Sequence, residues 1–318
     1  MGFPTLEETF DTMYSTTWPK VGTKVIDQMF YKMPLMYWFT KTLRKSSEGG
    51  RWIGRQIRLR TNTAGKSFGR GATFDQVDLD AVTMTRFLMR NVGIPLTRYW
   101  EDEQINAGKA AIVKIVQENM ENTVSSFKQL LQDLFWATTP GSTDPLSLPY
   151  YVREDPTSAT TIAGIDQSAE ADWRNQYQDC SGNSFYTHGL KFMRDIAMLA
   201  EKWGTTKYII CGKDAFSIYD DVALEQKRIT DSKMGDAEFT NTGWKGIPLV
   251  LDYDAPDDSL YGLDSSAFEL NISPNAYFKW TKWKEIPNAL DKVAQLVARM
   301  QLICTKRKSQ WVLFNISA

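Results

Sequence analysis

The hydrophobic pattern of residues 51–97 predicts a long β-hairpin. Apolar and polar positions alternate over residues 52–61, which puts Ile53, Ile57 and Leu59 on one face and Gln56, Arg58 and Arg60 on the other. A glycine-rich tip follows, and a second extended run covers residues 74–95. An isolated two-stranded ribbon is marginal in water. The hairpin therefore needs another surface to lie on.

A long amphipathic helix is predicted directly after the hairpin, from residue 101 to about residue 137. Its apolar positions recur every three, four or seven residues: Ile105, Ile112, Val116, Met120, Val124, Phe127, Leu131 and Leu134. Such a helix would be about 55 Å long, whereas a compact globule of this chain length has a radius of gyration of only about 20 Å. These proportions favour an extended subunit whose missing core is supplied by copies of itself.

The remaining pattern predicts a body made of two separated pieces. Residues 1–45 are rich in aromatics and are expected to pack on their own domain or on a neighbour. Helices alternate with short strands at 208–211, 249–252 and 260–263, which indicates a small inserted α/β domain. The chain then returns to strands at 276–283, 293–304 and 310–316, and we expect the last two to form a hairpin turned at 306–309.

Composition places few limits on this picture. The 37 Lys+Arg against 38 Asp+Glu give a net charge of −1, so the whole molecule is no polyanion binder and repels its own copies little. Three cysteines lie far apart in the sequence and predict buried thiols. The chain opens without a signal-peptide pattern, and its longest apolar stretch, residues 33–39, is too short to span a bilayer. We expect a soluble, intracellular protein.

Catalytic chemistry has little support in the sequence. The single histidine, His188, falls inside an amphipathic helix, where a packing or surface role is favoured over catalysis. Residues 64–67 read AGKS, but a phosphate-binding loop would need glycine where Arg60 stands and a helix where glycines follow. We predict no catalytic residue, no cofactor site and no enzyme activity.

Four acids, Asp252, Asp254, Asp257 and Asp258, raise the question of a metal site. The spacing of a calcium-binding EF-hand and its terminal glutamate are absent. Pro256 among the acids is typical of a turn. We therefore interpret this cluster as a solvated turn and predict no metal.

Basic residues dominate the hairpin up to its tip, since Glu48 is the one acid between residues 41 and 70. A basic ribbon can grip nucleic acid or lie on an acidic face of a neighbouring subunit. Phe68 and Phe74 are too few for a base-stacking platform, which favours the protein partner. The candidate intersubunit contacts are Arg55, Arg58, Arg60, Lys66 and Arg70.

The order of these parts resembles the major capsid proteins of tailed double-stranded-DNA phages, which have the Hong Kong 97 (HK97) fold. The resemblance rests on short segments as well as on layout: GGRWI at 49–53, TIAGID at 161–166, DWRN at 172–175, WKGIPL at 244–249, and the closing run 293–318. It implies an α+β, HK97-like capsid fold with an N-terminal arm (1–45), an extended loop (46–80), a peripheral domain (81–184 and 270–318) and an inserted axial domain (185–269).

The same resemblance implies a function and partners. The chain would be a major capsid protein that self-assembles into hexamers and pentamers of an icosahedral shell around a phage genome. It would assemble in the host cytoplasm, with a separate scaffolding protein if one is used, and with portal and decoration proteins and packaged DNA as further partners. Two alternatives stay open: an encapsulin-type compartment shell, and a nucleic-acid-binding enzyme that uses the basic hairpin.

Overall fold

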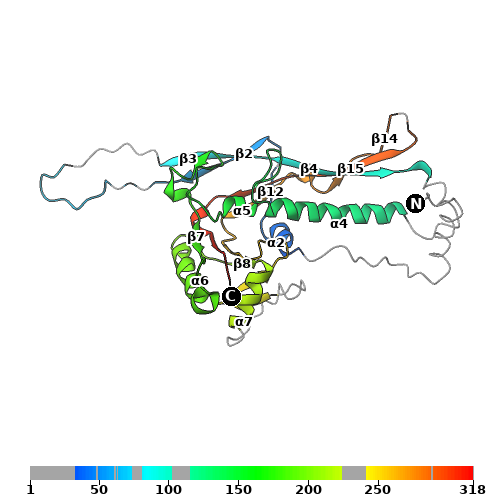
Figure 1. Ribbon diagram of the computed structural model, residues 1–318. Helices are drawn as coiled ribbons and strands as arrows, with labels where there is room; N and C mark the ends of the chain where they lie inside the picture. Colours follow the sequence, from blue (N-terminus) through cyan, green and yellow to red (C-terminus); the bar gives the residue numbers. More distant parts are fainter. Residues whose placement is uncertain are drawn as a thin grey trace. The chain divides into compact units, whose positions relative to one another are not determined.

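The computed structural model describes residues 33–47, 49–60, 62, 64–73, 81–101, 115–223, 241–287 and 289–317 (Figure 1). The chain divides into two compact units. The smaller unit includes Gly93–Phe127 and Trp280–Leu296, and the larger consists of Lys32–Val92, Lys128–Lys279 and Val297–Ala318. The predicted N-terminal arm up to residue 32 and the part of the predicted spine helix at 102–114 lie outside the described residues.

One six-stranded sheet is organised around the long strand β15 (Lys292–Cys304). Within the larger unit, β1 (Arg44–Ser46) runs parallel to β12 (Phe268–Ile272), and β12 runs antiparallel to β15 with Phe268 opposite Cys304. Within the smaller unit, β14 (Lys284–Glu285) pairs with the start of β15. The strands β4 (Arg90–Arg98) and β13 (Lys279–Trp280) also pair with β15.

The second six-stranded sheet lies in the larger unit, with strand order β7-β16-β11-β8-β10-β9. Its strands are β7 (Gln176–Asp179), β16 (Trp311–Phe314), β11 (Leu260–Leu263), β8 (Tyr208–Cys211), β10 (Ile247–Leu251) and β9 (Asn241–Trp244). β8 pairs in parallel with β10 and antiparallel with β11. A short two-stranded pair, β5 (Thr161–Ile162) and β6 (Ile165–Asp166), stands apart from it.

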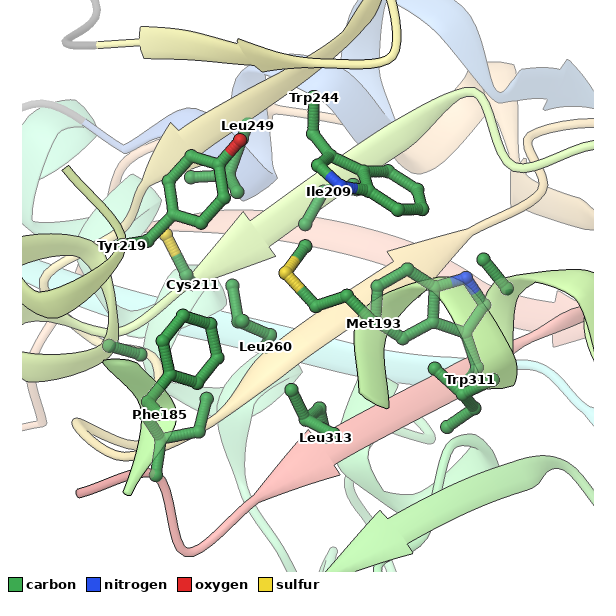
Figure 2. Packing of buried hydrophobic residues seen from close by; sticks show 14 of the residues in the cluster. Phe185, Met193, Ile209, Cys211, Tyr219, Trp244, Leu249, Leu260, Trp311 and Leu313 are labelled. Carbon is green, nitrogen blue, oxygen red and sulfur yellow. The ribbon is translucent and has the colours of Figure 1, made fainter. Parts of the chain in front are cut away.

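Helices cover both faces of this second sheet, so all four residues of β8 are buried. On one face, α6 (Phe185–Glu201) and α7 (Lys213–Ala223) contribute Phe185, Met193 and Tyr219 to the core, as Figure 2 shows. On the other face, Trp38 of α2 (Pro34–Thr42) stacks on Tyr208 with ring centroids 4.8 Å apart. A strand buried on both sides is expected to be continuously apolar, which explains the YIIC sequence of β8.

The centre of this core depends on one glycine. Gly262 of β11 lies opposite Trp311 of β16, and a Cβ at Gly262 would overlap the indole ring. Trp311 is fully buried, and its indole Nε1 donates to Thr206 Oγ1 at 3.0 Å. The missing side chain at Gly262 therefore makes room for the largest residue of the neighbouring strand.

The remaining elements agree in part with the sequence pattern. The helix α4 runs over Ile115–Trp136, so its end agrees with the predicted end near residue 137. A short helix, α5, covers Leu148–Tyr151, and 3-10 turns cover Ala171–Trp173, Pro274–Ala276 and Arg307–Ser309. The strand predicted at 276–283 is only the two residues of β13.

The prediction that the last two strands form a hairpin is wrong. β15 belongs to the first sheet, whereas β16 pairs with β7 and β11 in the second. The 3-10 turn at Arg307–Ser309 leads the chain from the first sheet to the second. Arg307 is buried in this turn and holds it against the body, whereas the tip of a hairpin would be exposed. β7 and β16 also lie outside residues 185–269, so the second sheet extends beyond the range predicted for the axial domain, and the domain boundaries themselves stay a prediction.

Candidate assembly surface on the β2–β3 ribbon

The predicted hairpin is present as a two-stranded antiparallel ribbon. β2 (Trp52–Arg58) pairs with β3 (Val82–Leu88), with Trp52 opposite Leu88 and Arg58 opposite Val82 (Figure 1). Residues 64–69 at the tip have no regular structure, and residues 74–80 lie outside the described part of the chain. The ribbon pairs with no other strand among the described residues.

The inner face of the ribbon is apolar and covered. Ile53, Ile57 and Phe87 are buried, as the alternation predicted for the two isoleucines. Thr85 is also buried, and its Oγ1 donates to the carbonyl oxygen of Arg55 at 2.9 Å. Phe87 packs near Tyr151, with ring centroids 6.5 Å apart. This face fixes the ribbon on the body of the larger unit.

The outer face carries large apolar side chains that the sequence analysis did not assign. Trp52, Val82, Met84 and Leu88 keep 41–54% of their surface exposed. The Trp52 ring lies against Gly54, where an added Cβ would sit 3.1 Å from it, and Arg86 is 5.0 Å from the ring centroid. These four residues lie on the same face as Gln56 and Arg58, so the face expected to be polar carries both apolar and polar side chains.

The predicted basic contacts separate into two groups. Arg55 Nη2 lies 2.6 Å from Glu269 Oε2, and Arg60 Nη2 lies 2.6 Å from Glu170 Oε1, so both are paired within the chain. Arg58 is exposed beside Val82, and Lys66 and Arg70 are exposed at the tip. An intersubunit role for these five residues stays a prediction, and it fits the second group best.

Glu269 anchors the base of the ribbon to the first sheet. Its carboxylate accepts from Lys45 Nζ and Arg55 Nη2, both at 2.6 Å, and its side chain is 12% exposed. Burial of Glu269 works to raise its pKa, but the hydrogen bonds and charge of Lys45 and Arg55 outweigh it, so the pKa is held below the ordinary value of 4.5. The ionised form is therefore the one that folding favours.

The stability of the subunit should consequently depend on Glu269 in acid. The stabilisation is present above the ordinary carboxyl pKa and is lost as pH falls through the lowered folded-state pKa. Glu269→Gln should reduce the free energy of unfolding by about 1 kcal/mol at pH 7, because solvent screens the exposed ends of the pair. Urea titrations between pH 7 and pH 3 should show a smaller acid-dependent loss in the variant. Equal losses in both proteins would contradict this assignment.

One predicted solvated turn contains a buried acid. Asp252 is fully buried and accepts from Gln132 Nε2 at 2.9 Å, from Trp136 Nε1 at 3.2 Å and from the backbone N–H of Leu35 at 3.2 Å. Burial raises the pKa of Asp252, and the hydrogen bonds from the Asp254 N–H, Gln132 and Trp136 oppose the rise. The interpretation of Asp252 as a solvated residue is therefore wrong. Its role is to join α2 and α4 to the end of β10.

The described residues offer little for catalysis. His188 is exposed on α6, with Nδ1 2.8 Å from Thr187 Oγ1, so it lies at the surface, and its non-catalytic role stays a prediction. Cys180, Cys211 and Cys304 are free and buried, and burial raises the pKa of each thiol. No group of three or more metal-ligating side chains gathers in the described ranges, and none of the helices found there could cross a membrane.

Comparison with known proteins identifies the fold. No protein-family model and no curated protein matches the sequence. Among solved structures, the chain is similar to a chain of the cyanophage A-1(L) capsid, with a TM-score of 0.66 and 14% identity over 93% of this chain and 96% of that chain. It is also similar to the SrpI encapsulin of Synechococcus elongatus PCC 7942, with a TM-score of 0.60 and 9% identity over 100% and 97%.

A third solved structure is also similar over nearly the whole chain at low sequence identity. The capsid of the myovirus XM1 matches with a TM-score of 0.55 and 6% identity over 99% of both chains. The mixed helix-and-strand architecture of this chain is thus the HK97-like fold of shell-forming proteins, and the fold expected from the sequence is confirmed.

Proposed function

We propose that this chain is the major capsid protein of a tailed double-stranded-DNA phage and has a structural, non-enzymatic role. The observation that carries the proposal is the ribbon of an HK97-like fold with large apolar side chains on its solvent face. Contiguous exposed apolar patches on soluble proteins mark interaction sites. The outer face of the β2–β3 ribbon is therefore the part of the larger unit that a neighbouring copy covers.

The partners follow from this role. Copies of the chain form the hexamers and pentamers of an icosahedral shell in the host cytoplasm, and the finished protein resides in the virion capsid. A scaffolding protein, a portal, decoration proteins and the packaged DNA are the further partners we propose. An encapsulin-type compartment comes second, because one of the three similar structures is an encapsulin, with a TM-score of 0.60, whereas two are phage capsids, with TM-scores of 0.66 and 0.55.

Assembly of purified protein tests the proposal. Sedimentation velocity should show a large, uniform species beside free subunits, and electron microscopy should show closed particles of uniform diameter. Isolation of the same particles from phage-producing cells should recover double-stranded DNA, whereas a compartment shell would contain protein cargo. A protein that remains monomeric at every concentration and ionic strength would refute the shell function.

A further inference from the structure

A pocket of about 380 Å³ opens beside the end of β2 in the larger unit, and nothing described so far fills it. Ile57, Leu59 and Trp173 provide apolar lining, and Trp203 stands at the C-terminal end of α6. Arg307, which is buried, also lines the pocket, and the positive charge nearer the surface comes from Arg58, Arg60, Lys306 and Lys308. Such a mixture of apolar floor and charged rim is typical of a binding site.

Two of these four cations are already paired within the chain. Arg60 pairs with Glu170 at 2.6 Å, and Lys308 pairs with Asp172 while its Nζ lies 4.0 Å from the centre of the Trp203 ring. Arg58 and Lys306 are exposed and have no acidic partner among the described residues. Among the described residues, Arg58 and Lys306 therefore present positive charge without an acidic partner, next to the apolar walls of the pocket.

The distribution of charge favours a protein side chain over nucleic acid as the occupant. Glu170 and Asp172 already neutralise Arg60 and Lys308. The charge left at Arg58 and Lys306 matches one or two carboxylates better than a phosphate backbone, which carries one negative charge per about 1.7 Å of duplex. Lys308 Nζ lies over the Trp203 ring, 4.0 Å from its centre, so a base cannot stack on that face of the ring. The volume, by contrast, suits one aromatic side chain accompanied by one or two carboxylates.

A segment with this chemistry exists on the chain itself. In the turn at residues 253–258, Tyr253 is 58% exposed and Asp257 is also exposed. The turn is held rigidly, because Asp252 Oδ1 accepts from the N–H of Asp254 at 3.1 Å and the Asp257 carbonyl accepts from the N–H of Ala215 at 2.8 Å. A rigid aromatic anchor binds with little loss of conformational entropy.

A second exposed tyrosine that lies near an acid is a weaker candidate. Tyr186 is 50% exposed, but its hydroxyl donates to Asp221 Oδ2 at 3.2 Å in the same chain. The hydroxyl of Tyr253 makes no hydrogen bond among the described residues. Of these two tyrosines, Tyr253 is the one whose hydroxyl still needs a partner when its ring is buried.

We propose that the turn at 253–258 of one copy inserts Tyr253 into this pocket of the next copy, with Asp257 facing Arg58 and Lys306. The inference rests on the proposed shell function and names one contact between copies in that shell. The turn and the pocket are different patches, and we infer a heterologous contact, with one turn in one pocket between each pair of neighbours. A heterologous contact that closes on itself generates a ring, whereas an isologous contact stops at a dimer.

Cysteine cross-linking measures this arrangement directly. The variant Asp257→Cys with Lys306→Cys keeps Tyr253 and Arg58, and the native cysteines are buried. Oxidation of its particles should give a ladder of covalent oligomers that ends at the size of the ring. Each single variant should give no ladder. The matched control Asp221→Cys with Lys306→Cys tests the rival patch at Tyr186 and should also give none.

The outcomes separate the contact from the shell function. Particles that form normally but give no ladder, or that give one only with Asp221→Cys, would overturn the contact and leave the shell function intact. Wild-type protein that forms no particles would overturn the shell function and the contact with it. As a second measurement, Tyr253→Ser should raise the protein concentration needed for assembly at least tenfold, whereas Tyr177→Ser, which changes another exposed tyrosine, should not. An equal effect of both serine variants would contradict the proposal.

Discussion

Replacing Arg307 with methionine should lower the free energy of unfolding by about 4 kcal/mol, because four buried hydrogen bonds from one charged group are lost together. Arg307 is 1% exposed. Its guanidinium donates to the carbonyls of Tyr151 at 2.7 Å and Trp173 at 2.9 Å, and to the side chains of Gln167 at 3.0 Å and Asn175 at 3.2 Å. Urea unfolding followed by tryptophan fluorescence measures the change.

The adjacent residue supplies a matched control. Lys308→Met removes a cation from an exposed ion pair with Asp172 and should cost less than about 1 kcal/mol. Burial lowers the pKa of Arg307 to about 10, so the group remains charged at neutral pH. Arg307→Lys should therefore keep the charge but lose most of the stabilisation that Arg307 provides, since an ammonium group cannot donate to all four acceptors as the planar guanidinium does. A loss in Arg307→Met no larger than that of Lys308→Met would show that the network contributes little.

The double variant Met84→Glu with Leu88→Glu should remain folded and fail completely to form shells. Met84 is 54% exposed and Leu88 is 41% exposed in the subunit, so each change should alter stability by only about 0.5 kcal/mol. In an assembled shell the two carboxylates would be buried against a neighbour, and burying an unpaired charge is strongly unfavourable. Circular dichroism checks the fold, and sedimentation velocity with electron microscopy checks the assembly.

A pair on α6 serves as control for this experiment. Met198 and Leu199 are 51% and 59% exposed, so Met198→Glu with Leu199→Glu introduces the same charges at equally exposed apolar positions. Shells of normal size should form from this control. Normal shells from the ribbon variant would show that the outer face of the β2–β3 ribbon is not an assembly surface.

Sequence patterns predicted the elements whose neighbours are close along the chain. The continuous apolar run at Tyr208–Cys211 and the alternation around Ile53 and Ile57 both fix a local structure through burial, and both predictions are confirmed. The outer face of the ribbon was missed because it depends on register. Trp52 gains its exposed neighbours Met84 and Leu88 only when β2 and β3 are paired, and the sequence alone does not give that pairing.

The same reason explains the misassigned residues near the C-terminus. A turn containing Lys306, Arg307 and Lys308 has the composition of an exposed hairpin, and only the neutral acceptors from residues 151–175 turn Arg307 into a buried anchor. Asp252 differs from Asp254, Asp257 and Asp258 in the same way. Its partners Leu35, Gln132 and Trp136 are far away in the sequence, so no local pattern could separate it from its acidic neighbours.

The hydrogen bonds of the buried Asp252 should affect the rate at which the subunit unfolds. Its hydrogen bonds span 217 residues to Leu35, 120 to Gln132 and 116 to Trp136. Closing loops of this length costs chain entropy before any contact is gained, so such contacts form late on the folding pathway. Late contacts hold the native state against unfolding and leave the folding rate almost unchanged. We therefore expect the buried carboxylate of Asp252 to slow unfolding, and so to lengthen the time for which a subunit stays folded before the proposed assembly.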